Sequence, residues 1–145
     1  MAEKKEGYYG CVFSSNFEED FYNIDDRFTV DIGYGEEPSY IFYLKKDGAV
    51  QKGIDIWEAY IEAIAELIPM ENGRMTGLPY YLNVGIFEDE HWHIDDTEHF
   101  YRQLKAVDPA ALNEMSCGNA DAHSALLAFV KEMLDSGNEI DVMRF

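Results

Sequence analysis

The stretch Tyr40-Ile41-Phe42-Tyr43-Leu44 decides how this chain can fold, because it is apolar at every position. Successive side chains of a strand point to opposite faces of a sheet, so an unbroken apolar run indicates a central or well-covered strand. Residues 35–38 before it predict a turn, and the alternation over residues 28–34 predicts a strand with one face in water. We expect these two strands to pair as a hairpin, in a unit that ends at Asp47-Gly48.

Helix-capping residues and the 3.6-residue period place the other elements. Asp55 and Glu58 fit a capping box at the start of a helix that Pro69 ends. Gly137 predicts the C-terminal cap of the last helix. We expect strands over residues 8–13, 28–34, 40–44, 82–86 and 140–145, helices that begin at Asp55, near Thr97 and at Asn119 or Asp121, and shorter helical turns after Ser15 and Pro109.

This order of elements predicts an α+β fold in a single domain, residues 1–145. We expect a largely antiparallel sheet of about four to five strands, with three main helices packed on it. No internal repeat or Pro/Gly-rich linker divides the sequence. Hydrophobic residues make up 47% of the 145, which is enough for a core despite the charge.

The chain is strongly acidic, with 29 acidic residues against 11 basic ones and a formal net charge of -18. Half of this excess lies between residues 51 and 100. Binding to nucleic acid depends on Lys and Arg neutralising phosphates, so direct nucleic-acid binding is excluded, as is docking to an anionic membrane. A basic protein partner, a cation or simple solubility remains as the use of the charge.

The termini and the cysteines indicate a cytoplasmic protein. Residues 1–6 lack the apolar stretch of a signal peptide, and no apolar run is long enough to span a membrane. Cys11 and Cys117 are too few and too isolated for a disulfide framework, so we expect reduced thiols. Cys11 lies among apolar residues and is expected in the core.

Cys117 is the one candidate nucleophile. It precedes the last helix, whose dipole would lower the thiol pKa, and His123 follows nearby. The simpler interpretation is a small residue in a glycine-containing loop. Motifs of hydrolases, phosphate-binding loops, dinucleotide-binding folds and zinc proteases are all missing, so the sequence favours binding over catalysis.

Glu58, Glu62 and Glu66 repeat at four-residue spacing along the helix expected from Asp55, with no Lys or Arg between them. Residues four apart on a helix are neighbours, and each like-charge pair costs about 0.2–0.5 kcal/mol. One interpretation is a solvated face of an acidic protein. The other is that the uniform negative charge binds a cationic partner.

The densest group of ionisable residues runs from Glu88 to His99, where six acids and three histidines fall within twelve positions. If residues 91–94 are extended, His91 and His93 share one face of the strand. Trp92 and Ile94 then share the other.

One interpretation of this segment is a divalent metal site. Imidazole and carboxylate groups suit zinc, iron or manganese, and His91 and His93 would supply the first two ligands. The further ligands at hand are Glu90, Asp95 and His99. A metal-binding protein or metal-dependent enzyme is therefore an alternative function.

The other interpretation is structural and interfacial. Asp95 or Asp96 would cap the helix that begins near Thr97, and Trp92 would anchor its entry to the core. An aromatic residue among acids also suits an interface, because the ring supplies contact area while the charges select a cationic partner.

Small size, a high aromatic content, acidity, the α+β order and the acidic Trp-containing segment from Glu88 to Glu98 together resemble the immunity proteins that neutralise bacterial polymorphic toxins, many of which are basic nucleases. The resemblance implies a cytoplasmic inhibitor that covers the cationic site of a toxin domain, without any cofactor. It rests on no shared motif, so it assigns no residue. A nucleic-acid mimic is a further alternative. From the residues themselves, we expect the partner-binding surface to contain Glu58, Glu62, Glu66, Asp89, Glu90, Trp92, Asp95 and Asp96.

Overall fold

The computed structural model describes residues 23–31 and 37–144, and it confirms an α+β fold. The strand expected over residues 8–13, Cys11 and the start of the helical turn after Ser15 lie outside the described residues. The elements are β1 (Ile24–Phe28), β2 (Ser39–Lys46), β3 (Ala49–Trp57), α3 (Glu58–Glu66), α4 (Gly77–Asn83), the 3-10 helix η1 (Gly85–Phe87), β4 (His91–Ile94), α5 (Thr97–Lys105), α6 (Pro109–Asn113), α7 (Ala120–Ser136) and β5 (Ile140–Arg144).

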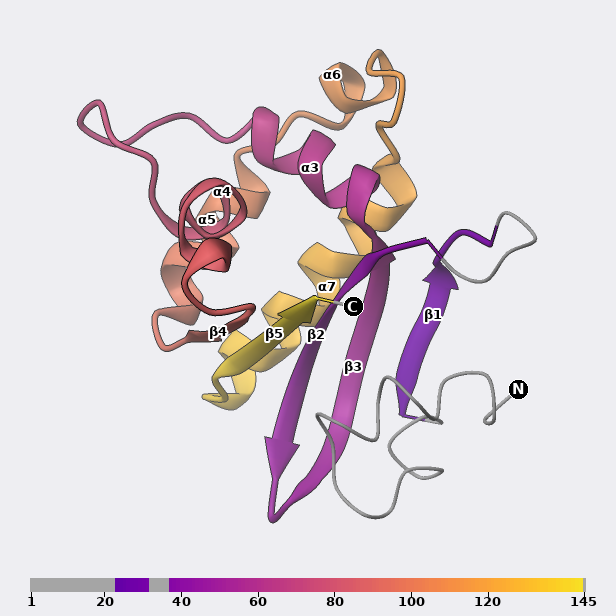
Figure 1. Cartoon of the computed structure of the whole chain (residues 1–145), viewed down its shortest axis with the longest axis vertical. Helices are drawn as coiled ribbons and strands as arrows, with labels where there is room; N and C mark the ends of the chain where they lie inside the picture. The colour runs from indigo at the N-terminus through magenta and orange to yellow at the C-terminus, as the bar shows by residue number, and fades with distance from the viewer. Residues whose placement is uncertain (1–22, 32–36, 145) are drawn as a thin grey trace.

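The described strands form one five-stranded sheet in the order β1-β3-β2-β5-β4 (Figure 1). β1 runs parallel to β3, and the other neighbours are antiparallel. β2 lies in the middle, and Ile41 and Phe42, which point to opposite faces, are both fully buried. The apolar run 40–44 is therefore a central strand covered on both sides, as predicted.

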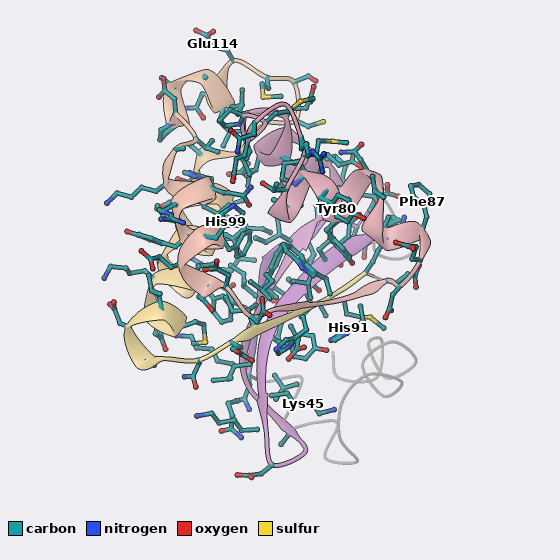
Figure 2. The ribbon with its side chains drawn as sticks, turned by 90° about the vertical axis from the view of Figure 1, so that its left-hand side faces the viewer. Lys45, Tyr80, Phe87, His91, His99 and Glu114 are labelled. Atoms are coloured by element: carbon teal, nitrogen blue, oxygen red, sulfur yellow. The ribbon has the colours of Figure 1, made fainter. Side chains whose placement is uncertain are left out.

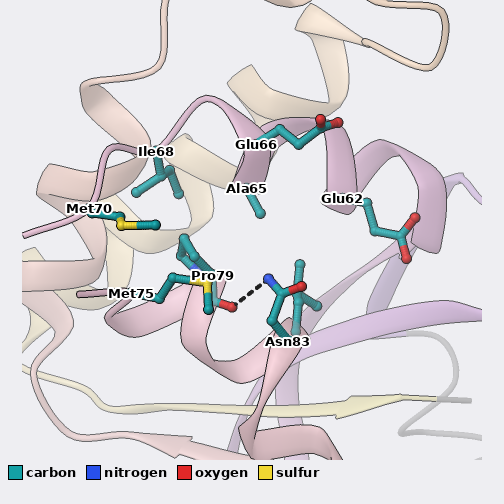
Figure 3. A pocket seen from close by; sticks show the side chains of 9 residues that line it. Glu62, Ala65, Glu66, Ile68, Met70, Met75, Pro79 and Asn83 are labelled. Atoms are coloured by element: carbon teal, nitrogen blue, oxygen red, sulfur yellow. Dashed lines mark hydrogen bonds between the residues drawn. The ribbon is translucent and has the colours of Figure 1, made fainter. Parts of the chain in front are cut away.

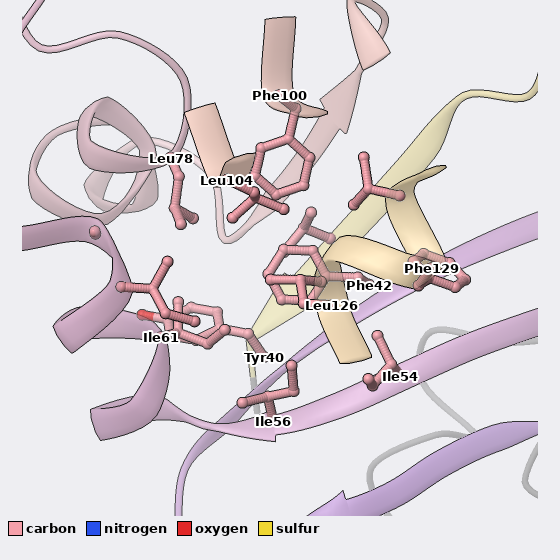
Figure 4. Packing of buried hydrophobic residues seen from close by; sticks show 14 of the residues in the cluster. Tyr40, Phe42, Ile54, Ile56, Ile61, Leu78, Phe100, Leu104, Leu126 and Phe129 are labelled. Atoms are coloured by element: carbon pink, nitrogen blue, oxygen red, sulfur yellow. The ribbon is translucent and has the colours of Figure 1, made fainter. Parts of the chain in front are cut away.

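The helices pack on the face of the sheet that carries Phe42, Ile54 and Val142. Figure 4 shows Leu126 and Phe129 of α7 against this face, beside Phe100 and Leu104 of α5. Their side chains recur at the spacing of a buried helix face, which is why the sequence predicts these helices well. In the part of the chain that the structure describes, no helix combines the length and apolar character needed to cross a bilayer.

Helix caps agree with the sequence at α5 and α7. The Asp96 side chain accepts a hydrogen bond from the His99 amide, and Asn119 accepts one from the Ala122 amide. Gly137 ends α7 in the left-handed conformation, with φ of 71°. The final strand and the short helix after Pro109 are also confirmed.

The predicted hairpin is wrong in its partner strand. β2 pairs with β3, and Asp47-Gly48 forms their two-residue turn rather than ending the unit. Both turn residues have positive φ, 54° and 76°, as a type I′ turn requires. The strand expected over residues 28–34 instead covers Ile24–Phe28, where it pairs in parallel with β3, and residues 32–34 lie outside the described part.

Two further predictions are corrected. Asp55 does not cap a helix: it is a fully buried residue within β3, and α3 begins at Glu58. Residues 82–86 are not a strand but the end of α4 and the start of η1. Leu78 and Tyr81 are buried three residues apart while Val84 is exposed, so this segment follows helical rather than alternating burial.

The turn allows a direct test of the hairpin. A Cβ at Gly48 would meet nothing within 4 Å, so Gly48→Ala changes only the backbone preference. Because Gly48 has φ of 76°, we expect the free energy of unfolding to fall by about 1–2 kcal/mol in urea. The matched Asp47→Asn variant should stay within about 0.5 kcal/mol of the natural protein, since Asn tolerates this conformation. Equal stability of all three proteins would contradict the turn assignment.

Candidate protein-binding surface

α3 has one buried and one exposed side. Ile61 and Ile64 are fully buried in the core, whereas Glu62 and Glu66 are exposed. Glu58 lies in the first turn and is half-buried. The predicted row of carboxylates is therefore present, although its first member faces a different environment from the other two.

Arg144 of β5 pairs with Glu58. Its Nη2 and Nε atoms lie 2.7 and 2.8 Å from Glu58 Oε1, in a half-buried ion pair. The sequence did not predict a cation beside α3, because Arg144 lies in the last strand, far from α3 along the chain. Burial raises the pKa of Glu62, and the charge of Glu58 raises it further. A cation bound beside Glu62 would therefore stabilise its ionised form.

A pair of tyrosines connects α3 to the second acidic segment. The rings of Tyr40 and Tyr81 meet edge to face with centroids 5.9 Å apart, and the Tyr81 hydroxyl donates a hydrogen bond to the backbone carbonyl of Glu90. Burial and then the charge of Glu58 raise the pKa of Tyr40 to about 12. Burial also raises the pKa of Tyr81, with added effects from Glu90 and Asp89. Two acidic segments distant in sequence thus lie on either side of this pair.

The remaining predicted residues have other surroundings. The ring of Trp92 stacks on Tyr81 at 5.0 Å and meets Phe100 at 5.6 Å, so this half-buried side chain supports the surface from within. Asp96 is used as the cap of α5, while Asp95 is exposed. Both follow the end of β4, whereas Glu90 precedes its start. The length of the strand, roughly 13 Å, therefore separates them from Glu90.

Four exposed apolar side chains were missed by the sequence reading. Phe87 is 83% exposed and Met70 is 64% exposed, whereas Tyr80 and Val84 are exposed to 44% and 38%. Tyr80, Val84 and Phe87 follow one another at helical spacing along α4 and η1, and Figure 2 shows Tyr80 and Phe87 on the same part of the molecule. A helix predicted over this segment would have placed these residues together, but a strand was predicted over residues 82–86.

A groove of about 410 Å³ separates α3 from α4 (Figure 3). Glu62 and Glu66 stand on its α3 side, and Pro79, Leu82 and Asn83 form its α4 side. Its other lining residues are Ala65, Ile68, Met70 and Met75. The groove thus combines an apolar interior with carboxylates along one rim.

Gln103 of α5 fixes the position of α4, which forms one side of this groove. Its Oε1 accepts a hydrogen bond from the Leu78 amide at 3.3 Å, and its Nε2 donates to the Thr76 carbonyl at 3.0 Å. Gly77 permits this approach, because a Cβ there would lie 2.1 Å from Gln103 Oε1. The buried amide side chain therefore fixes the start of α4 through hydrogen bonds to the backbone of Thr76 and Leu78.

The histidines of β4 lie on the face of the sheet opposite Trp92, as predicted. His91 Nε2 and His93 Nδ1 are each 2.8 Å from Asp141 Oδ1, and His93 Nε2 is 2.7 Å from Glu139 Oε1. His99 is not part of this group: it bonds Glu71 at 2.7 Å, and Figure 2 shows it well apart from His91.

Of the predicted metal ligands, His91 and His93 share the Asp141 carboxylate, whereas His99 lies elsewhere and bonds Glu71. Within residues 23–31 and 37–144, no group of three or more His, Cys, Asp or Glu side chains is arranged to hold a metal ion. The β4–β5 contact is instead a set of hydrogen bonds between imidazoles and carboxylates.

His93 makes the stability of the β4–β5 contact depend on pH. Hydrogen bonds to Asp141 and then Glu139 raise the pKa of His93, because two carboxylates on one ring favour the doubly protonated form. A raised folded-state pKa stabilises the protein below the unfolded pKa of about 6.5 and ceases to do so as pH rises through the folded value. We expect His93→Gln to lower the free energy of unfolding at pH 5.5, and the loss to shrink by pH 8.5.

Urea unfolding of both proteins at several pH values measures this difference directly. The Asp141→Asn variant, which lacks the shared carboxylate, should show a smaller effect of His93→Gln. A difference that is constant or that grows with pH would contradict the proposed role of His93.

Cys117 and His123 do not form a nucleophile and base in an open cleft. His123 is buried, and its Nε2 lies 2.7 Å from the Leu104 carbonyl, so the ring joins α7 to α5. Cys117 is a half-buried free thiol in the loop before α7. The placement of Cys117 agrees with its interpretation as a small residue in a loop.

No family model matches the sequence, and neither a curated protein nor a solved structure matches it.

Proposed function

We propose that this protein is an acidic protein-binding module that caps the cationic site of a basic protein partner, in the manner of an immunity protein that neutralises a toxin. One observation carries the proposal: the acidic segments of α3 and of residues 88–90 lie on either side of the Tyr40–Tyr81 pair, next to exposed apolar side chains.

Charge and apolar contact have separate roles in such a complex. A surface of one sign steers an oppositely charged partner and speeds association, whereas buried aromatic side chains supply most of the affinity. Here Glu62, Glu66 and Glu90 supply exposed charge, and Phe87 and Tyr80 supply exposed aromatic area. A nucleic-acid mimic would need acids spaced like phosphates over an extended face, and it would have no use for exposed apolar residues.

The expected residues divide by what they do in the proposed complex. Glu62, Glu66 and Glu90 face the partner, and Asp95 adds to the field from the far end of β4. Asp89 is exposed as well, although its Oδ1 also accepts a hydrogen bond from the His91 amide. Glu58, Trp92 and Asp96 act indirectly, because each is engaged within the protein: Glu58 with Arg144, Trp92 with Tyr81 and Asp96 with the start of α5.

The test begins with the immobilised chain, which should retain a basic protein from the source lysate at low salt and release it as salt rises. With that protein purified, we expect its association rate to fall about tenfold or more between low and high ionic strength. The dissociation rate should change much less, because screening acts mainly on the encounter.

Two charge variants sharpen this experiment. Glu62→Gln with Glu66→Gln should slow association at low salt, since both remove charge from the proposed surface. Asp47→Asn with Glu114→Gln changes the net charge equally at the hairpin turn and after α6, and should slow association less. An association rate indifferent to salt, or equal for the two double variants, would contradict the proposal.

A further inference from the structure

We infer that the groove between α3 and α4 is a docking site for an amphipathic, basic helix of the partner protein. The inference rests on the proposed function and makes it more specific. The groove would take an apolar side chain of the partner, and the carboxylates on its rim would pair with the cations that flank that side chain. Binding in the groove is tested with peptides, separately from the salt dependence of association.

The interior of the groove suits an aliphatic or aromatic side chain. Ala65 and Ile68, both largely buried, lie on the α3 side, and Leu82 lies opposite on α4. Met70 and Met75 stand at one end, as Figure 3 shows. Methionine is flexible and polarisable, so these two residues can adapt to the shape of an inserted side chain.

The rim of the groove selects a cationic occupant. Glu62 and Glu66 are both exposed and lie one helical turn apart. None of the described residues that line the groove is basic. Burial and the neighbouring charge of Glu58 already raise the pKa of Glu62, so a cation placed there would favour its ionised form.

The spacing of the two carboxylates favours a helix as the occupant. Side chains four residues apart on a helix lie about 6 Å apart, so Lys or Arg at such positions would match Glu62 and Glu66. Apolar residues about 100° around the helix from these cations would then face the groove. Docking of an amphipathic helix into an apolar groove is a common mode of peptide recognition.

Exposed residues of α4 extend the site beyond the groove. Tyr80 is adjacent to Pro79 in α4, and Val84 directly follows Asn83 where the helix ends, so both lie next to residues that line the groove. Phe87 follows in η1.

Two synthetic peptides of identical composition provide the test. One places Lys and Leu so that they form an amphipathic helix, and the other has the same residues in scrambled order. Fluorescence anisotropy at moderate salt should give a dissociation constant at least about tenfold lower for the amphipathic peptide. Equal affinities would show attraction by charge alone, and would overturn the docking site while leaving the proposed function intact.

A matched pair of variants locates the binding. Asn83→Lys puts a cation and extra volume into the groove, and Asn113→Lys makes the same change at the exposed end of α6. We expect Asn83→Lys to weaken the amphipathic peptide at least about tenfold and Asn113→Lys less than about twofold. Equal effects of the two variants would overturn the inference.

Met70→Ala serves as a second variant, because this side chain is 64% exposed and its truncation should leave the fold intact. Unchanged thermal unfolding together with weaker binding of the amphipathic peptide is the expected result. Absence of binding by either peptide would overturn the docking site, whereas the proposed function would still be decided by the salt dependence of the partner from the lysate.

Discussion

A continuous row of aromatic rings connects the sheet to the helices beside the candidate protein-binding surface. Tyr40 meets Tyr81 at 5.9 Å, Tyr81 stacks on Trp92 at 5.0 Å, Trp92 meets Phe100 at 5.6 Å, and Phe100 stacks on Phe42 at 5.9 Å. The row joins the central strand β2 to α4, β4 and α5, and aromatic pairs of this geometry add about 0.5–1.5 kcal/mol each beyond the area they bury. Because the rings fix α4 and the start of β4 against the sheet, the acidic residues around them are held in one place despite their mutual repulsion.

Much of the fold could be predicted from local signals, whereas the pairing of the strands could not. Asp96, Asn119 and Gly137 identify helix ends because capping is a local interaction between a side chain or a glycine and the adjacent turn. Strand pairing is not local. Residues 28–34 and 40–44 looked like partners because they are adjacent, although Asp47-Gly48 is a stronger hairpin signal and joins β2 to β3. Because Asp47-Gly48 was expected to end the strand unit, the next helix was expected to begin at Asp55, which belongs to β3.

The acidic residues of the candidate site could be predicted, but its shape could not. The spacing of Glu58, Glu62 and Glu66 and the extended alternation over residues 91–94 were readable, because each depends only on local periodicity. The pairing of Glu58 with Arg144 depends on where the last strand enters the sheet. The exposure of Phe87 and the groove beside α4 depend on Gln103 fixing that helix, a contact between distant residues that no local pattern contains.

Hydrogen–deuterium exchange of the protein, alone and bound to the basic partner that it retains at low salt, tests the central claim most directly. The two acidic segments and the groove between α3 and α4 should share one footprint, so we expect slower exchange on binding across α3 and residues 70–90. The amides of α6, the exposed side of α7 and the β2–β3 turn should be unaffected. Slower exchange confined to those elements, with α3 and α4 unchanged, would show that the partner binds elsewhere and would contradict the account.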